Sequence, residues 1–370
     1  MIKVFNAIPQ GDSCGWGVCG TQLARYMPDH CEIVGLIADA DVVLMPVVNE
    51  KWDVPPECEW AWNIAMEYHT PVVGYGFHEF DIRGTQQIHW LPSHFTALAC
   101  GSAWMHDWVK LALHEVAPDF PLSVVLQGVD KERFYYRPQE KPDFMKDRFV
   151  VASAGKFEFR KGQDVVIEAF RRFKKSVPEA MLMLNWDNPW PMTMLSMNAS
   201  KWKHDLELIG LEGAVYVGGV DRNLIAPEDQ VTWRIGQNAD MPKFYQNADI
   251  AVFPNRCEAG TNLPLMEAIA SGVPSVIHDA TGQSDIADML YGLSSCVLVD
   301  EGTKFKYPGS GDPVAHWNEP CVASFLSGMM KLYRDRPLEA DRESLSHELD
   351  GLSWSKTAKG LVSLAESVLK

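Results

Sequence analysis

The stretch NRCEAGTNLPLMEAIASGVPSV, residues 255–276, decides the fold. It follows ADIAVFP (residues 248–254), an apolar run that predicts a buried strand, and it contains LPLMEAIASG, which has helical spacing. Two carboxylates, Glu258 and Glu267, flank the small residues that join this strand to this helix. Because open α/β sheets bind ligands beyond the carboxyl ends of their strands, the turn is a candidate ligand site.

Strand-like runs alternate with helix-length segments through most of the chain. DVVLMPV (41–47) and TPVVGYGF (70–77) predict strands in the first half, and FVVASAG (149–155) begins a second series. This alternation is typical of a mostly parallel sheet covered by helices. The charged, proline-bearing stretch at 135–148 reads as a linker, and 370 residues favour more than one core. We therefore expect an α/β protein with two domains, residues 1–140 and 141–350, followed by a C-terminal segment, 351–370.

Local expectations include one long helix and two stretches without regular structure. Residues 201–211, KWKHDLELIGL, predict a helix, whereas 187–200 and 222–236 have weak periodicity and read as loops.

Composition excludes several classes of function. The chain has 49 acidic and 33 basic residues, a net charge of −16, which disfavours nucleic-acid binding and allows at most peripheral membrane association. The eight cysteines are scattered and form no C-x-x-C pair, so we expect reduced core thiols of a cytoplasmic protein. The amino-terminal residues lack the apolar region of a signal peptide, and no apolar run is long enough to span a bilayer.

The glycine pattern GWGVCG, Gly15 to Gly20, matches the dinucleotide-binding fingerprint, and Asp39 follows at a suitable distance. In that fingerprint the strand runs directly into the first glycine, whereas PQGDSC (9–14) intervenes here. We expect a glycine-rich loop before a short helix, TQLARYM (21–27). An NAD-dependent oxidoreductase that uses the Gly15–Gly20 loop stays open as an alternative.

Four ordered motifs resemble those of family-4 glycosyltransferases. They are LQGVDKERF (126–134), ASAGKFEFRKGQDVVIEAF (152–170), CEAGTNLPLMEAIASGVPSVI (257–277) and LSWSKTAKGLVSLAESVL (352–369). The resemblance implies the GT-B architecture, in which two Rossmann-like domains face a central cleft, and a C-terminal helix that packs back toward the first domain. It also implies a retaining, metal-independent enzyme without a cofactor. Its partners would be a nucleotide-sugar donor, bound mainly by the second domain, and a carbohydrate or lipid-linked acceptor.

The resemblance also assigns roles to individual residues. Glu267 would bind the nucleotide ribose, and His78 and Glu258 would be catalytic. The donor diphosphate would meet Lys156, Lys161, Gly15 and Leu263. The donor sugar would meet Glu258, Ala259, Gly260, Thr261 and Asn262.

Three positions depart from the family pattern. Lys156 stands where arginine is usual, and Asp285 stands where glutamate is more common. Eight residues, not seven, separate Glu258 from Glu267, so a non-catalytic sugar-nucleotide-binding relative is a further alternative.

The sequence predicts no metal site. Asp39 and Asp41 form a D-x-D pair, but they precede a strand of the first domain, away from the other motifs. The chain also lacks a cluster of histidine and cysteine with metal-ligand spacing.

Overall fold

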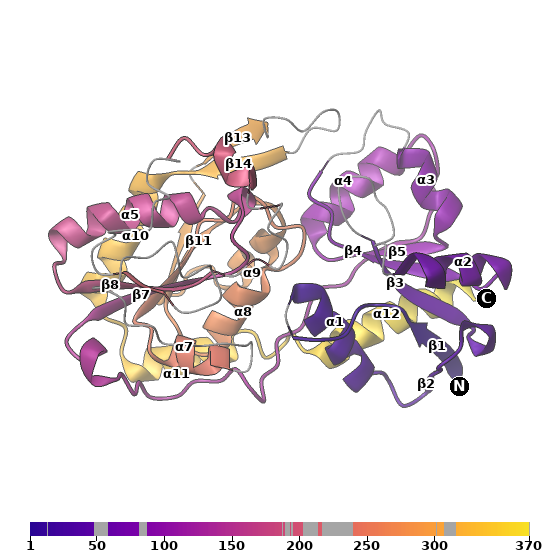
Figure 1. The fold of residues 1–370 in the computed structure, drawn as a ribbon, viewed down its shortest axis with the longest axis horizontal. Coiled ribbons are helices and arrows are strands. Elements are labelled where there is room, and N and C mark those ends of the chain that lie inside the picture. Colours follow the sequence, from indigo (N-terminus) through magenta and orange to yellow (C-terminus); the bar gives the residue numbers. More distant parts are fainter. Residues whose placement is uncertain are drawn as a thin grey trace.

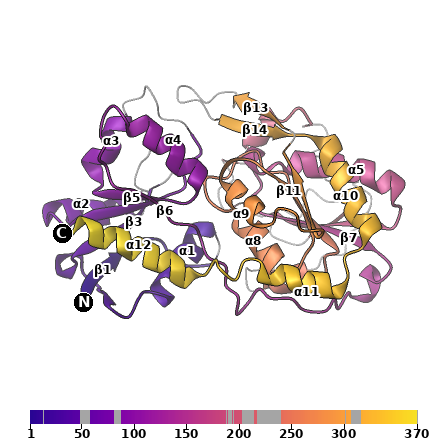
Figure 2. The same cartoon turned by 180° about the vertical axis from the view of Figure 1, so that it is seen from behind.

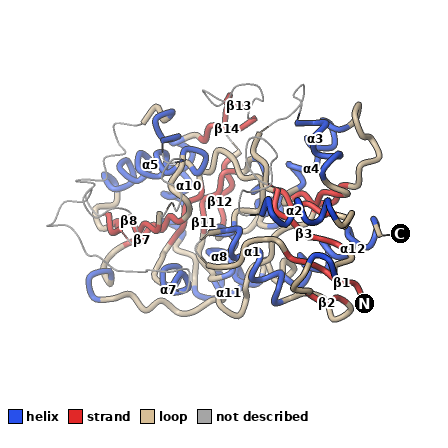
Figure 3. Tube along the Cα trace, turned by 45° about the vertical axis from the view of Figure 1, so that its right-hand side comes forward, coloured by secondary structure: helices blue, strands red, loops and turns tan. Residues whose placement is uncertain are grey.

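The computed structural model of the chain describes residues 1–12, 14–47, 58–80, 87–186, 188, 193, 195–202, 214–216, 240–300, 302–306 and 316–369. These residues form two α/β lobes that lie side by side (Figure 1; Figure 3). Each lobe is built on one parallel sheet.

The first lobe carries a sheet of order β2-β1-β3-β4-β5-β6 in which all pairs are parallel. Its strands are β1 (Ile2–Asn6), β2 (Cys31–Ile33), β3 (Val42–Val47), β4 (Val72–Gly76), β5 (Ala97–Cys100) and β6 (Leu122–Val124). Successive residues of β3 and β4 face opposite sides and enter two separate cores. The helices of one core are α2 (Glu59–Glu67), α3 (Gln87–His94) and α4 (Ala103–Leu113), and those of the other are α1 (Gly15–Arg25) and α12 (Trp354–Val368).

The second lobe carries a sheet of order β12-β11-β10-β7-β8-β9, again parallel. Its strands are β7 (Phe149–Ala154), β8 (Ala180–Asn185), β9 (Ala214–Tyr216), β10 (Ile250–Phe253), β11 (Ser275–His278) and β12 (Cys296–Val299). The chain leaves β7 toward one edge of the sheet and returns through β10 toward the other. The switch point of this Rossmann-like order therefore lies between β7 and β10.

Helices cover both faces of the second sheet as well. One face packs against α5 (Gln163–Ser176) and α10 (Val322–Asp335), and the other packs against α7 (Met241–Gln246), α8 (Leu263–Ala270) and α11 (Glu339–His347). The short α9 (Ser284–Met289) follows β11. An antiparallel hairpin of β13 (Gly302–Lys306) and β14 (His316–Pro320) projects beside this sheet (Figure 1).

The C-terminal helix α12 returns to the first lobe. Figure 2 shows the chain leaving α11 under the second lobe and running as α12 along the first sheet. Trp354, Ala358 and Leu361 of α12 are buried in a first-lobe core, and the Thr357 hydroxyl donates to the Leu126 carbonyl at 2.9 Å.

The predicted fold class is confirmed, but the expected glycine-rich loop is not. Gly15–Gly20 is the start of α1 and not a loop. A Cβ at Gly20 would lie 2.1 Å from the Pro9 carbonyl oxygen, and one at Gly17 would lie 3.0 Å from the Gly11 backbone. These two glycines therefore let α1 pack closely on the loop that follows β1.

Other boundaries differ from expectation. Helix α3 and strand β5 were not predicted. The sequence of β5, ALAC, is too short an apolar run to stand out. The expected loop 187–200 contains a 3₁₀ turn at Leu195–Ala199. Most of the expected helix 201–211, from residue 203 on, and all of the expected loop 222–236 lie outside the described residues.

Candidate functional site

The ends of β7 and β10 bring two sequence motifs together at the switch point. A 3₁₀ turn, Phe159–Lys161, follows β7 and leads into α5, and residues 255–262 lead from β10 into α8. Gly162 connects the 3₁₀ turn to α5 and has a left-handed backbone conformation (φ +73°). A Cβ at Gly162 would lie 2.0 Å from the Pro254 carbonyl oxygen. Only glycine lets the Lys161 turn lie this close to the end of β10.

Three cations and three carboxylates form one cluster at this point, which we call the interdomain cluster. It comprises Lys156, Arg160, Lys161, Glu79, Glu158 and Glu258. Both carboxylate oxygens of Glu258 are engaged: Oε1 contacts the Lys161 ammonium, and Oε2 lies 3.1 Å from an Arg160 Nη. The Asn255 amide also donates to Glu258 Oε1.

Arg160 connects Glu258 to Glu158 and, through Glu79, to the first lobe. Its Nε lies 2.6 Å from Glu158 Oε1 and 2.9 Å from Glu79 Oε1. Lys156 lies 3.0 Å from the other oxygen of Glu158. Glu79 follows β4, so the cluster joins the two lobes through Arg160.

Burial shifts the pKa values of the cluster. It lowers the pKa of Lys161, and the neighbouring Arg160 lowers it further against the pull of Glu258. Burial raises the pKa of Glu79, although Arg160 opposes this rise. Lys161 is thus a desolvated cation beside an arginine, and an added anion would stabilise its charged form.

The turn predicted to hold a sugar, Ala259 to Asn262, is buried under the first lobe. A Cβ at Gly260 would lie 2.6 Å from the ring of Phe77. The Ser102 hydroxyl donates to the Ala259 carbonyl at 2.7 Å, and the Thr261 hydroxyl donates to Gln127 Oε1 at 3.2 Å. Asn262 adopts a left-handed conformation (φ +64°) immediately before α8.

His78 lies just beyond β4 in the first lobe and is 1% exposed. Its Nδ1 lies 2.9 Å from the Phe80 carbonyl and 3.2 Å from the Phe80 amide, and its ring packs against Trp108 at 5.9 Å between centroids. Its neighbour Glu79 is the residue that contacts Arg160. The segment Phe77–Phe80 therefore reaches the interdomain cluster through Glu79, whereas the His78 ring packs against Phe80 and Trp108 of the first lobe.

Gly15 and Leu263, both predicted to meet the diphosphate, come from different lobes and lie next to each other. A Cβ at Gly15 would be 3.9 Å from Leu263 Cδ1. Leu263 starts α8, and Pro264 in the first turn suits a helix start because its missing N–H has no partner to lose.

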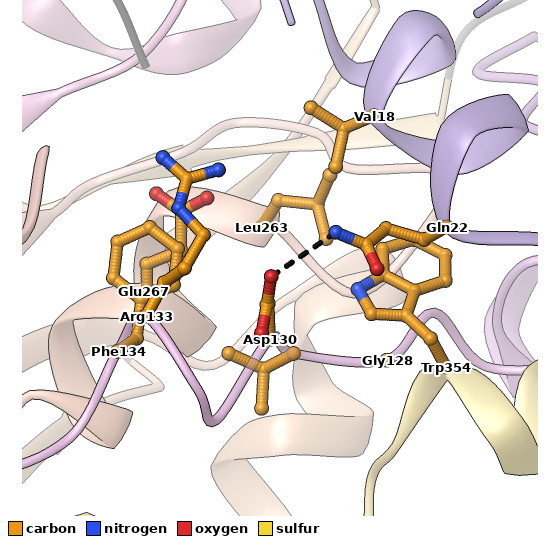
Figure 4. Close-up of a pocket in the computed structure, with 10 residues that line it drawn as sticks. Val18, Gln22, Gly128, Asp130, Arg133, Phe134, Leu263, Glu267 and Trp354 are labelled. Carbon is orange, nitrogen blue, oxygen red and sulfur yellow. Dashed lines mark hydrogen bonds between the residues drawn. The ribbon is translucent and has the colours of Figure 1, made fainter. Parts of the chain in front are cut away.

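Glu267, one turn further along α8, lines a small pocket between the lobes (Figure 4). Figure 4 shows the Arg133 guanidinium beside the Glu267 carboxylate, with Asp130 across the pocket. Gln22 of α1 donates to Asp130 at 3.2 Å. Burial raises the pKa of Glu267 to about 8, although Arg133 and Tyr245 both act to lower it.

The D-x-D pair lies in the first lobe, just before β3. Asp39 belongs to a 3₁₀ turn, Ile37–Asp39, and Asp41 Oδ2 accepts a hydrogen bond from the Lys3 amide at 2.8 Å. Among the described residues, no three or more histidine, cysteine, aspartate or glutamate side chains are grouped so as to hold a metal ion.

Sequence reasoning missed four members of the site: Arg160, Glu158, Asn255 and Glu79. Arg160 stands beside Lys161 in RKG, so its charge was visible. The contacts of Glu79 and Asn255 depend on how distant segments meet, and local sequence carries no signal for that.

Two Rossmann-like lobes, each built on one parallel sheet, are the architecture of the GT-B fold. Residues 148–303 match the model of the family Glycosyl transferases group 1. No curated protein matches the chain in sequence.

Solved structures with the same fold span almost the whole chain. Sucrose-phosphate synthase from Thermosynechococcus elongatus has a TM-score of 0.61 at 12% identity and covers 99% of both chains. Anabaena HepE in complex with UDP-glucose has a TM-score of 0.60 at 13% identity and covers 99% of this chain and 100% of its own. The pneumococcal O-GlcNAc transferase GtfA, in complex with UDP and GlcNAc, has a TM-score of 0.54 at 12% identity and covers 95% of this chain and 60% of its own.

The family match over residues 148–303 and the GT-B fold of the whole chain together support a glycosyltransferase. The predicted fold and the predicted class of enzyme are confirmed at this level. In the part of the chain that the structure describes, no helix is long and apolar enough to cross a bilayer.

Proposed function

We propose that the protein is a retaining glycosyltransferase. It moves a sugar from a nucleoside-diphosphate-sugar to a glycan, lipid or small-molecule acceptor, and it acts in the cytoplasm without metal or cofactor. The observation that carries this proposal is the engagement of both Glu258 oxygens by Lys161 and Arg160 at the switch point of the second sheet. Ligands of open α/β folds bind at such points.

The donor diphosphate would take the place of Glu258 on these two cations. As the glycosidic bond breaks, negative charge grows on the leaving diphosphate, and fixed cations in a dry site stabilise it strongly. The amino terminus of α8 at Leu263 adds partial positive charge, and Gly15 faces it from the first lobe. Lys156 would supply a third charge.

Release from the cations would free Glu258 for the donor sugar. A carboxylate accepts hydrogen bonds from sugar hydroxyls, and the backbone of Ala259, Gly260, Thr261 and Asn262 would supply further polar groups. Because the first lobe covers this turn, the donor can enter only when the lobes separate. Closure would then bring His78 to the donor sugar and exclude water, which limits wasteful hydrolysis.

The pocket beside Glu267 suits the nucleoside. A protonated carboxyl, favoured by the raised pKa, can both donate to and accept from a ribose diol, and the ionised form accepts from both hydroxyls. The structures of HepE with UDP-glucose and of GtfA with UDP and GlcNAc make UDP-sugars the first donors to test.

The deciding experiment is a thermal-shift screen over nucleotide sugars, with UDP-glucose and UDP-GlcNAc first and GDP- and ADP-sugars as comparisons. A true donor at a hundred times its Kd adds about 2.7 kcal/mol of stability. Turnover of that donor should persist in EDTA, and NMR of the product should show an unchanged anomeric configuration.

Three outcomes contradict parts of this proposal. Activity lost in EDTA and restored by Mg²⁺ or Mn²⁺ refutes metal independence. Inversion at the anomeric carbon refutes the retaining mechanism. Tight binding without turnover, even to free nucleoside diphosphate, identifies a non-catalytic relative.

A further inference from the structure

The β13–β14 hairpin of the second lobe contacts the first-lobe segment that carries His78. Trp317 of β14 is 3% exposed, and its indole N–H donates to the Glu79 carbonyl at 3.0 Å. Its ring lies 5.8 Å from that of Phe80 and 6.4 Å from that of Phe159. These rings belong to a small apolar cluster that spans both lobes.

The hairpin is itself firmly attached to the second lobe. An isolated two-stranded hairpin has little stability in water, so it depends on its contacts. The Asn318 amide donates to the Arg256 carbonyl at 3.1 Å, and Glu319 pairs with the Arg256 guanidinium at 2.6 Å. Trp317 thus projects from a strand that is fixed next to the 255–258 turn.

The second lobe therefore binds both the backbone carbonyl and the side-chain carboxylate of Glu79. Trp317 binds its backbone carbonyl, and Arg160 binds its carboxylate, while Arg160 also contacts Glu258. His78 is the residue immediately before Glu79. A buried indole needs a partner for its N–H, so its bond to the Glu79 carbonyl fixes where this backbone lies.

We propose that Trp317 is a positioning residue, which docks the His78 segment onto the second lobe and so sets where His78 stands relative to Glu258 and the donor sugar. This inference rests on the proposed role of His78 in transfer. Trp317 acts on this segment through the backbone of Glu79 and the packing of Phe80. It would therefore affect the reacting, closed enzyme more than the binding of the donor.

The kinetic test compares Trp317→Phe with wild type. This change keeps an aromatic ring and removes the N–H that binds Glu79. We expect donor KM within about twofold of wild type, kcat for transfer lower by about tenfold, and a higher ratio of donor hydrolysis to transfer. Trp60→Phe is the matched control, since Trp60 is 55% exposed on α2 of the first lobe.

A purely structural role for Trp317 makes a different forecast. It would lower the melting temperature and the folded fraction and leave kcat per folded molecule and the hydrolysis ratio at wild-type values. That result overturns the proposal.

Hydrogen exchange tests the docking without any turnover. In Trp317→Ala, peptides that cover residues 76–80 should exchange faster than in wild type, whereas Trp60→Ala should leave them unchanged. Unaltered exchange in Trp317→Ala refutes the docking. If the wild-type protein turns over no nucleotide sugar, the proposed function fails, and the exchange measurement still decides whether Trp317 docks this segment.

Discussion

Two clusters of ion pairs lie on either side of the same turn, residues 255–258. They differ in whether all of their members come from one lobe or from both. Arg256 is 0% exposed and makes two bonds of 2.8 Å to Asp164, one of 2.6 Å to Glu319 and one of 2.7 Å to the Phe159 carbonyl. We call Arg256, Asp164 and Glu319 the buried cluster. All of its members belong to the second lobe, whereas the interdomain cluster two residues further on takes Glu79 from the first.

The difference shows that similar ion pairs can serve opposite purposes. All three nitrogens of the Arg256 guanidinium donate hydrogen bonds to groups of the second lobe. The buried cluster therefore holds the turn in place within this lobe, and a movement of the first lobe breaks none of these bonds. In the interdomain cluster, the proposed function has a diphosphate replace Glu258 on the cations and has Glu79 leave when the lobes separate. The first cluster holds the shape of the turn, and under this proposal the second is an exchangeable anion site.

Arg256→Leu should have the largest effect. It leaves the Asp164 carboxylate buried without its main partner, and breaking a buried pair in this way costs about 3–5 kcal/mol. Denaturant unfolding measures the loss. A change below about 1 kcal/mol would show that the buried cluster does not hold the turn.

His78→Ala should reduce transfer far more than donor binding. A contact made only in the closed, reacting complex is expressed in kcat, and we expect a loss of about 2.7–4 kcal/mol in transition-state stabilisation. Melting temperature, donor Kd and kcat are measured on one preparation. Since the His78 ring is buried against Phe80 and Trp108, a lower melting temperature with normal kcat per folded molecule would leave it only a packing role.

Lys161→Ala and Glu258→Gln should move the affinity for free UDP in opposite directions. The first removes a charge-assisted phosphate contact and should weaken binding by about 1.5–3 kcal/mol. The second removes the anion that competes for Lys161 and Arg160, so UDP should bind more tightly while transfer falls. Calorimetry with UDP measures both. Weaker binding by Glu258→Gln would mean that the carboxylate does not stand in the place of the diphosphate.

Glu267→Gln should have the smallest effect at neutral pH, and its main effect is on how the free energy of unfolding depends on pH. The folded protein holds a proton on Glu267 up to about pH 8, whereas the unfolded chain releases it near the ordinary value of 4.5. The native state therefore binds more protons between these values, and the free energy of unfolding falls as pH rises through this window.

The glutamine variant lacks this contribution. Relative to Glu267→Gln, wild type should lose roughly 3–4 kcal/mol of stability between pH 5 and pH 8, of which roughly 1–1.5 kcal/mol is still present at pH 7. Thermal unfolding across that range measures the difference. Parallel curves for the two proteins would show that Glu267 titrates normally.

Most of the second-lobe strands around the site were predictable from sequence, because β7, β8, β10 and β11 are apolar runs bounded by turn residues. Elements with weaker signals were missed, such as β5 with four residues and the β13–β14 hairpin. The glycine fingerprint misled for a related reason. The pattern does not show whether Gly17 and Gly20 allow a ligand or another backbone segment to come close. In this structure they allow α1 to pack closely against residues 9–11.

The sequence by itself determined the α/β class, the placing of Lys161 and Glu258 after strands, and the resemblance to glycosyltransferases, because periodicity and strand-end motifs are local properties. Only the tertiary structure decided that Arg256 and Glu258, two residues apart, belong to different clusters. It alone joined Glu79 to Arg160 and Trp317 to Glu79. The physical reason is that an ion pair or a buried indole is completed by whichever partner the packing of distant segments delivers, and that packing depends on the whole chain.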